Sequence, residues 1–298
     1  MRGGREMIRI GQAGIPLSCK GRTNKDGIVY THKSLDLNAI EIQFVRGLYV
    51  LSDEEALFIK DYAAKNDIEI HVHAPYYLNL AGDKEEITMS YEKIMKSAQM
   101  ANSIGSKTLI IHPGYYGEYN PKKTLKIIIK NSKKLISMFK KEKLKVRLAM
   151  ETMGKQKVFG SLDEIIEVCT HVKEIVPVLD LGHIHARGNG SIQEREDFEA
   201  IFDKLRPLRL RHYLLHITGV LYENGNELYH VPIKKGDMPL GPLIDVILDR
   251  NLNVTLISES PLLEHDAVYI RLQVEKAIMK RTGKETAYYK DLSEVIKK

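Results

Sequence analysis

The stretches IEIHVH (residues 68–73) and KTLIIH (residues 107–112) are short, apolar and closed by a histidine, and four later stretches repeat this pattern. The later ones, which end in a histidine or a carboxylate, are VRLAME (146–151), VPVLD (176–180), YLLH (213–216) and VTLISE (254–259). Almost continuously apolar runs of this length are typical of strands buried on both faces of a parallel sheet. Because parallel strands of a barrel direct their carboxyl ends to one mouth, we expect the six terminal side chains to converge there, as in a metalloenzyme.

The rest of the chain alternates between predicted strands and helices. Residues 7–14 and 38–45 have the pattern of further strands, and residues 52–66 and 90–105 that of helices. Strand and helix repeat about eight times, which predicts an α/β fold, a single-domain (β/α)8 TIM barrel over residues 7–298, after a flexible extension at 1–6. A doubly wound open sheet shares the alternation, but GQAGIP (11–16) is a poor match to a GxGxxG phosphate loop, and an open sheet would spread the ligands too far apart.

Composition is that of an ordinary globular protein, with 43% hydrophobic and 28% charged residues among 298. No apolar run is long enough to span a membrane, and the N-terminal residues lack the apolar core of a signal peptide. Two cysteines, Cys19 and Cys169, have no metal-type spacing, and a reducing cytoplasm is expected. The net charge of +6 favours a polyanionic partner, although lysine-rich segments such as 122–143 are also explained as solvated helix faces.

Histidines and carboxylates at the strand ends are candidate metal ligands. A single histidine in such a position is more often a satisfied structural residue, but six equivalent positions are not explained that way. His183 follows Asp180 closely, and His230 lies in ELYHVPIKKGD (227–237), which is predicted to be a loop. The full candidate set is His73, His112, Glu151, Asp180, His183, His216, His230 and Glu259. These residues exceed the needs of one zinc ion, so two or three ions with a bridging carboxylate are expected, as in hydrolysis of phosphodiesters.

The motifs around these residues resemble those of endonuclease IV, the abasic-site endonuclease family of the xylose-isomerase-like barrels. The resemblance extends over most of the chain. It is carried by Glu151 and by HAPY (73–76), HPG (112–114), LDLGH (179–183), LLH (214–216) and SESP (258–261). It implies hydrolysis of the DNA phosphodiester 5′ to an abasic site, leaving a 3′-hydroxyl and a 5′-deoxyribose phosphate, in base excision repair. The implied partner is double-stranded DNA containing abasic sites, without a membrane or an obligate protein partner.

The resemblance also implies roles for individual residues in a site that holds two to three zinc ions, with manganese as the alternative metal. His73 and His112 match the ligands of one zinc, and Glu151 matches the catalytic carboxylate that bridges it to a second. Asp180, His216 and Glu259 would complete the second zinc, and His183 and His230 match ligands of the third. Arg46 and Tyr76 match side chains that contact DNA and wedge into the duplex beside the extruded nucleotide.

Three places depart from the family's motifs. The first strand is followed by GIPLSC (14–19) where the family has a GAHxS-type motif. ETMGKQ (151–156) keeps the glutamate of the ENTAG motif and loses its asparagine and alanine. Leu228 stands where the family has an aspartate two residues before the second histidine of the third zinc site, which is His230 here, and Glu227 is one residue out of register. The third ion is therefore the least supported of the three.

A metal-dependent sugar isomerase or epimerase of the same superfamily is the main alternative. Glu151, Asp180, His216 and Glu259 would satisfy its metal site, with Glu151 and Glu259 moving a proton between adjacent carbons. Such an enzyme has no use for His73, His112 and His183 together. A non-catalytic DNA-binding module is disfavoured, because contacts to phosphate do not require so many converging ligands.

Overall fold

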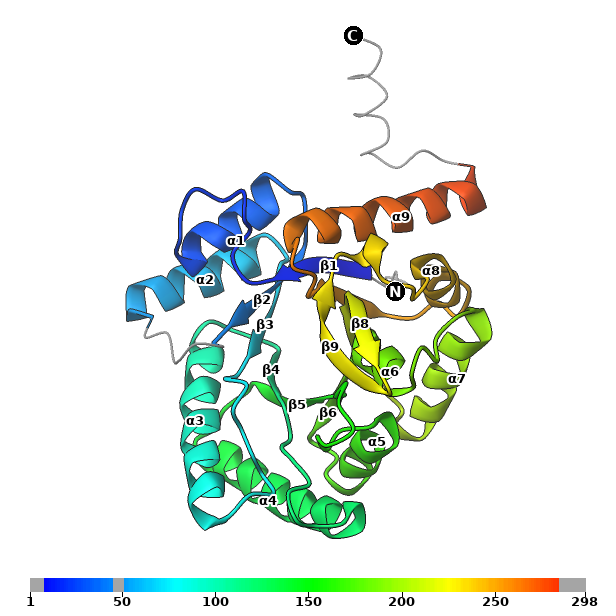
Figure 1. The fold of residues 1–298 in the computed structure, drawn as a ribbon. Helices are drawn as coiled ribbons and strands as arrows, with labels where there is room; N and C mark the ends of the chain where they lie inside the picture. The colour runs from blue at the N-terminus through cyan, green and yellow to red at the C-terminus, as the bar shows by residue number, and fades with distance from the viewer. Residues whose placement is uncertain (1–7, 45–50, 284–298) are drawn as a thin grey trace.

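Eight parallel strands close into a barrel in the computed structural model, which describes residues 8–44 and 51–283 (Figure 1). The barrel strands are β1 (Ile8–Ala13), β2 (Ala39–Gln43), β3 (Glu69–His73), β4 (Thr108–Ile111), β5 (Arg147–Glu151), β6 (Val176–Asp180), β7 (Tyr213–Ile217) and β10 (Val254–Ser258). Each strand pairs with its neighbour in the chain, and β1 closes the circle by pairing with β10. The predicted single-domain (β/α)8 barrel is confirmed.

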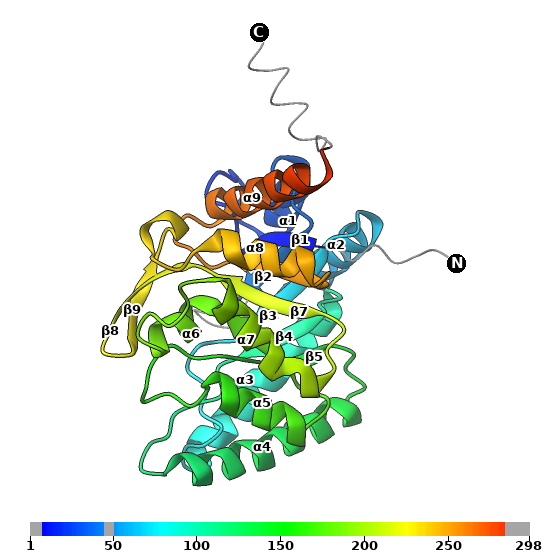
Figure 2. The same cartoon turned by 90° about the vertical axis from the view of Figure 1, so that its right-hand side faces the viewer.

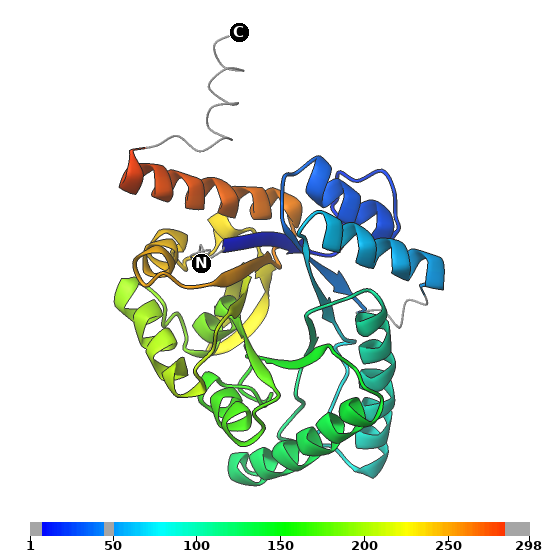
Figure 3. The ribbon, with the colours of Figure 1, turned by 180° about the vertical axis from the view of Figure 1, so that it is seen from behind.

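Helices surround the barrel, as the view from behind also shows (Figure 3). They are α1 (Asn24–Lys33), α2 (Asp53–Lys65), α3 (Lys84–Ser103), α4 (Pro121–Lys141), α5 (Leu162–His171), α6 (Leu181–Arg187), α7 (Arg195–Leu205), α8 (Leu240–Asp249) and α9 (Glu264–Thr282), with short 3-10 turns η1 (Arg206–Leu208) and η2 (Ile233–Lys235). The helix predicted over 90–105 begins earlier, at Lys84. Asp83 caps it by accepting the backbone N–H groups of Glu85 and Glu86, a signal that the apolar periodicity did not include.

An antiparallel hairpin follows β7 and replaces the predicted loop at 227–237. Its strands are β8 (Gly219–Glu223) and β9 (Asn226–Val231), and η2 follows them. In Figure 1 the hairpin crosses the near mouth of the barrel, and in Figure 2 it extends beyond the helices at one side. The prediction was wrong because β9 is partly exposed and polar, whereas the barrel strands are almost continuously buried.

Apolar side chains pack in two places: between the barrel and its helices, and inside the barrel. The outer layer contains the fully buried Phe44, Phe159 and Phe198. The inner cluster is formed by small and branched residues, namely Ala13, Ala39, Ile110, Ala149, Val178, Leu214 and Ile257. This inner layer fills the barrel below the mouth, so that the barrel is a packed core on which a site can rest.

Two predictions fall outside the described residues. The extension at 1–6 and Arg46 both lie in segments that the structure does not describe. Among the described helices, none is both long and apolar enough to cross a membrane. Cys19 and Cys169 are both buried and are not joined in a disulfide.

Candidate metal centre

The strand-end ligand candidates form the layer directly above the inner apolar cluster. Side chains alternate along a strand, so a residue two positions after an interior one also faces the interior. This spacing relates Ile110 to His112, Ala149 to Glu151, Val178 to Asp180, Leu214 to His216 and Ile257 to Glu259. The geometry of parallel strands therefore carries five side chains from five strands to one level of the mouth.

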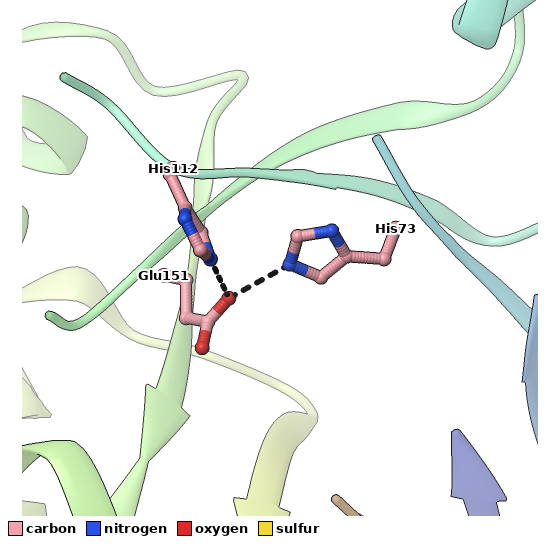
Figure 4. A group of neighbouring side chains, drawn as sticks. All are labelled: His73, His112 and Glu151. Carbon is pink, nitrogen blue, oxygen red and sulfur yellow. Dashed lines mark hydrogen bonds and ion pairs between the residues drawn. The ribbon is translucent and has the colours of Figure 1, made fainter. Parts of the chain in front are cut away.

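Glu151 and two histidines form the first group (Figure 4). The imidazoles of His73 and His112 both point at one carboxylate oxygen of Glu151, with Nε2–Oε2 distances of 3.0 and 3.2 Å. His73 Nδ1 donates to the backbone carbonyl of Ala74 at 2.6 Å, which fixes the ring so that Nε2 faces the carboxylate. His73 and Glu151 are almost completely buried.

Glu151, Asp180, His216 and Glu259 form the second group. Glu151 turns its other oxygen, Oε1, toward the ring nitrogen Nδ1 of His216 at 3.5 Å, and Glu259 Oε1 lies 3.4 Å from the same nitrogen. Asp180 uses one oxygen to cap α6 by accepting the N–H of His183 at 2.7 Å, which leaves Oδ2 directed away from the cap. Glu151 therefore faces both groups, one oxygen to each.

The third group contains Asp180, His183 and His230. The Nε2 atoms of the two histidines face each other at 3.3 Å. Their Nδ1 atoms donate to backbone carbonyls, His183 to Thr152 at 2.9 Å and His230 to Glu259 at 3.1 Å. All eight candidate ligands predicted from the sequence thus fall into three groups at one mouth, although their binding of metal stays a prediction.

Orphaned polar atoms show that this donor set fits a cation. Glu151 Oε1, Asp180 Oδ2 and His216 Nδ1 are buried and make no hydrogen bond of good geometry. An unsatisfied buried polar atom costs roughly 1–3 kcal/mol, and more when it is charged. All three atoms belong to the second group, and imidazole and carboxylate are ligands that zinc accepts. The residues present therefore fit divalent metal ions.

Mutual charge in the cluster shifts the pKa of its members in opposite directions. Burial opposes ionisation of Glu151, but the imidazoles of His112, His183 and His216 hold its pKa well below the ordinary value. Burial and the carboxylates of Glu151, Glu41 and Asp180 raise the pKa of Glu259 to about 7, against the opposing charge of His216. The cluster thus concentrates negative charge, which attracts cations.

Histidine pKa values follow from the same carboxylates. Burial lowers the pKa of His73, but its hydrogen bond to Glu151 and the charges of Glu151, Glu41 and Glu259 together outweigh this and raise the pKa to about 8. For His216, burial is outweighed by the charges of Glu259 and Glu41, which raise its pKa well above the ordinary value. The carboxylates therefore favour a positive charge on the imidazoles of His73 and His216, and a metal ion bound beside these rings would satisfy the same carboxylates.

Glu41 supports the centre from below, although it was not among the ligand candidates predicted from the sequence. Its Oε2 accepts from His216 Nε2 at 2.8 Å, and its Oε1 accepts from Gln43 Nε2 at 2.6 Å. Both Glu41 and His216 are fully buried. A carboxylate on the outer nitrogen of a ligating histidine fixes the tautomer and increases the basicity of the inner one. The period-two relation of Glu41 to Ala39, an inner-cluster residue, is the signal that would have found it.

Tyr76 covers the first group from the solvent side. Its ring stacks on that of His112, with centroids 5.1 Å apart, and meets His73 edge-on. The hydroxyl donates a long hydrogen bond of 3.5 Å to Gln43 Oε1. Tyr76 is therefore placed to contact a bound molecule, and its contact with DNA stays a prediction, as does that of Arg46.

A cavity of about 520 Å³ opens above the three groups. Its floor includes His112, Glu151, His183 and Glu259. Its walls carry exposed aromatic side chains and cations, among them Tyr77, Tyr115, Tyr229, Lys155 and Lys157. Exposed tyrosines offer surfaces for stacking against planar groups, and lysines attract phosphate.

The closed barrel of eight parallel strands with surrounding helices places the protein in the class of TIM-barrel proteins. Its histidine and carboxylate groups lie at the carboxyl ends of the strands. The model of the family described as xylose isomerase-like TIM barrel matches residues 30–277, and the chain belongs to this family.

Individual relatives differ in what is known of them. An uncharacterized protein of Methanocaldococcus jannaschii is 32% identical over 269 residues, which are 89% of this chain and 96% of that protein. A probable endonuclease 4 of Mesomycoplasma hyopneumoniae is 28% identical over 229 residues, or 74% of this chain and 79% of the relative. The second match supports the resemblance to endonuclease IV that the motifs indicated.

The chain shares its fold with solved structures of both classes, an endonuclease IV and an epimerase-like protein. The crystal structure of endonuclease IV from Thermus thermophilus superposes with a TM-score of 0.68 at 19% identity, covering 89% of this chain and 99% of that one. A D-tagatose 3-epimerase-like protein superposes with a TM-score of 0.66, also at 19% identity, covering 96% and 99%. At these identities the likeness shows the fold alone, so function has to be argued from the site.

Proposed function

We propose that this protein is a zinc-dependent abasic-site endonuclease that hydrolyses the DNA phosphodiester 5′ to an abasic site in base excision repair. The carrying observation is that the four-residue group of Glu151, Asp180, His216 and Glu259 is flanked by two further groups. One contains His73 and His112, and the other contains His183 and His230. A donor set of this size suits several ions acting on one phosphate group.

When bound, the ions supply positive charge that stabilises the phosphate oxygens in the transition state and favours ionisation of an attacking water. His73, His112 and Glu151 would hold one ion, and Glu151, Asp180, His216 and Glu259 a second. His183 and His230 would contribute to a third. Manganese is the alternative metal for such nitrogen and oxygen ligands.

The chain's own residues would bind and orient the DNA. Lys155 and Lys157 line the cavity and would pair with backbone phosphates on either side of the lesion. Tyr76 lies over His112 with its ring partly exposed, where it would pack against an extruded sugar. Tyr77 and Tyr229, which are 79% and 57% exposed, would stack against neighbouring bases. A small free sugar would leave this rim without contacts.

Arg46 follows β2 closely in the chain and would wedge into the duplex together with Tyr76. The expected product has a 3′-hydroxyl and a 5′-deoxyribose phosphate. Double-stranded DNA with abasic sites is the proposed substrate. A cytoplasmic location fits the two unpaired, buried cysteines.

A sugar epimerase or isomerase is the second candidate. The observation that favours it is Glu259, whose pKa is raised to about 7 by burial and neighbouring carboxylates, a value suited to proton transfer. The similarity in fold to a D-tagatose 3-epimerase-like protein is compatible with it. In that case only the four-residue group of Glu151, Asp180, His216 and Glu259 would bind metal.

A substrate comparison separates the two candidates. Metal-replete protein is incubated with a labelled duplex that contains one abasic site, with the undamaged duplex, and with a ketohexose, each with and without chelator. Cleavage of only the abasic duplex, abolished by chelator, is the expected result. Epimerisation of the ketose by protein that leaves the abasic duplex intact would select the second candidate.

A further inference from the structure

Position 228, where the family has an aspartate, is a leucine, but the neighbouring Glu227 places a carboxylate beside His183 and His230. Glu227, the neighbouring residue, lies with its Oε2 3.4 Å from His183 Nε2 and its Oε1 3.8 Å from His230 Nε2. In a regular strand, residues three apart point to opposite faces, so Glu227 and His230 would not be expected to meet. The hairpin must therefore depart from regular pairing between these two residues.

A β-bulge provides that departure. Along β8 and β9, Leu221 pairs with Tyr229 and the next residue, Tyr222, pairs with Glu227, so that Leu228 is the extra residue with no partner. A bulge of this kind redirects the side chains on one side of it. Leu228 and Tyr229 are exposed, whereas Glu227 and His230 face inward. The extra residue thus restores a carboxylate to the face that carries His230.

Glu227 is held there by the loop that follows β5. Its backbone N–H donates to the carbonyl of Gly154 at 2.9 Å. A Cβ at Gly154 would lie 2.8 Å from Glu227 Cβ and 2.9 Å from His183 Cδ2, closer than side chains tolerate. The segments ETMGKQ (151–156) and ELYH (227–230) both depart from the endonuclease IV motifs, and here they contact each other. The glycine in one makes room for the glutamate in the other.

The two histidine nitrogens require a positive charge between them. Because both Nδ1 atoms donate to backbone carbonyls, each neutral imidazole presents a lone pair at Nε2, and these lone pairs face each other at 3.3 Å. Two acceptors at this distance repel unless a proton or a metal ion lies between them. The carboxylate of Glu227 beside them selects for a cation.

The separations match those of ligands around one small ion. In a tetrahedral zinc site with bonds of roughly 2.0–2.1 Å, neighbouring ligand atoms lie about 3.3 Å apart. The distance from His183 Nε2 to His230 Nε2 is 3.3 Å, and that from His183 Nε2 to Glu227 Oε2 is 3.4 Å. The separation between His230 Nε2 and Glu227 Oε1 is longer, at 3.8 Å, and Asp180 offers a ligand atom within 4.8 Å of those of both histidines.

We infer that Glu227, delivered by the bulge at Leu228, is an anionic ligand of a third divalent metal ion, together with His183 and His230 and beside Asp180. This inference rests on the proposed function, since it completes the same metal centre. It replaces the expectation, drawn from Leu228, that β9 supplies no carboxylate to the third ion. The chain thus keeps the ligand set and changes the residue that supplies it.

Zinc binding by the full-length protein tests the inference without reference to catalysis. The protein is stripped with chelator and dialysed against buffered zinc, and bound metal is measured by elemental analysis. The parent should bind about three ions, one for each group of donors. Glu227→Gln should bind about two, or should bind the third at least roughly tenfold more weakly. Cobalt in place of zinc gives a second readout, because loss of a ligand changes its visible absorption.

Three further variants make the result specific. Glu223→Gln removes the same charge from an exposed position on the same hairpin and should keep all ions. Deletion of Leu228 places the glutamate two residues before the histidine in a regular strand, and it should also keep all ions. Gly154→Ala changes none of the ligand residues, but its added methyl group would crowd Glu227 and should weaken binding of the third ion.

The inference would be overturned if folded Glu227→Gln bound as many zinc ions as the parent with the same affinity. It would also be overturned if Glu223→Gln lost zinc to the same extent as Glu227→Gln. Loss of the ion on deletion of Leu228 would overturn the role of the bulge. Cleavage of abasic duplex is recorded in parallel. Loss of one ion in Glu227→Gln, combined with a parent that cleaves no DNA, would support the inference while removing the proposed function.

Discussion

Replacing Glu41 by glutamine tests how the centre is supported from below. Each carboxylate oxygen of Glu41 accepts one hydrogen bond, from His216 Nε2 at 2.8 Å and from Gln43 Nε2 at 2.6 Å. A glutamine at this position offers one oxygen and one NH2 group, so that one of the two donors must face another donor. Because the site is fully buried, no bulk water relieves the conflict.

The expected consequence is weaker binding of the ion held by His216. Glu41 keeps the proton on Nε2 and leaves Nδ1 for the metal, and removal of such support typically lowers metal affinity 10–100-fold. That range corresponds to about 1.4–2.7 kcal/mol. The dissociation constant of the zinc ion held by the second group should rise by this factor in Glu41→Gln. It is measured by titrating zinc into metal-free protein in competition with a chromophoric chelator.

Glu69→Gln is the matched control for this experiment. Glu69 also pairs with a buried histidine, His71, at 2.9 Å, but it lies at the amino end of β3, on the far side of the inner apolar cluster. The same substitution there should leave zinc affinity unchanged. If Glu41→Gln binds zinc within about twofold of the parent, or if both variants weaken it equally, the argument for Glu41 is refuted.

Four other expectations follow from the structure or, for Arg46, from the resemblance to endonuclease IV. Burial raises the pKa of Glu69, but the hydrogen bonds to His71 and Thr255 and the charges of His71 and His212 together outweigh it and hold the pKa at about 2 against an ordinary 4.5. Glu69→Gln should therefore lower the free energy of unfolding by up to about 3 kcal/mol at neutral pH. Because the pKa is depressed, this difference should disappear as the pH falls from 4.5 toward 2 in denaturant titrations, and a difference independent of pH would contradict it. Arg46→Ala and Tyr76→Ala should each weaken binding of abasic duplex more than of undamaged duplex in anisotropy titrations, and equal losses on both would remove the wedge roles. Chelation should lower the melting temperature, and zinc should restore it, because ions that bind only the folded state stabilise it. Phe198→Ala, at a fully buried position, should cost about 3–5 kcal/mol of stability without changing the metal content of the folded protein.

Strand-end residues were predictable because barrel geometry is local. A run such as VRLAME is apolar throughout, and its last residue must lie at the mouth if the strand is parallel to its neighbours. The inner face is then fixed by alternation from Ala149 to Glu151. For this reason the six strand-end candidates could be named before their positions in space were known, whereas His183 and His230 lie in α6 and β9 and were added because they follow Asp180 and His216 in the chain.

The position of Glu227 and the partner of Glu41 depend on contacts that spacing along one strand does not encode. The bulge at Leu228 depends on how β9 pairs with β8, and it reverses the side that a count along one strand assigns to Glu227. The role of Glu41 depends on His216, which is 175 positions away in the chain and meets it only after the barrel closes. The hairpin itself was missed because its strands are partly exposed and lack an apolar run.

The predicted start of a helix was accurate where the capping residue fell within the predicted range. Ser52, the first residue of the helix predicted over 52–66, caps α2, with its hydroxyl accepting the N–H of Glu55 at 3.1 Å. The start of α3 was placed too late because its first turn is polar and contributes little to the apolar periodicity, although Asp83 and Glu86 form a capping box there.

The measurement that tests the central claim most directly is single-turnover cleavage of a labelled abasic duplex by the parent and by Glu151→Gln. Glu151 faces four imidazoles, of which His73 is the nearest at 3.0 Å and His216 the farthest at 3.5 Å, so the isosteric change should disrupt two groups of ligands at once. We predict a cut 5′ to the lesion by the zinc-loaded parent, and a rate at least roughly 1,000-fold lower for Glu151→Gln with an unchanged circular dichroism spectrum. Equal cleavage by the two proteins, or an intact duplex after incubation with the zinc-loaded parent, would contradict the account.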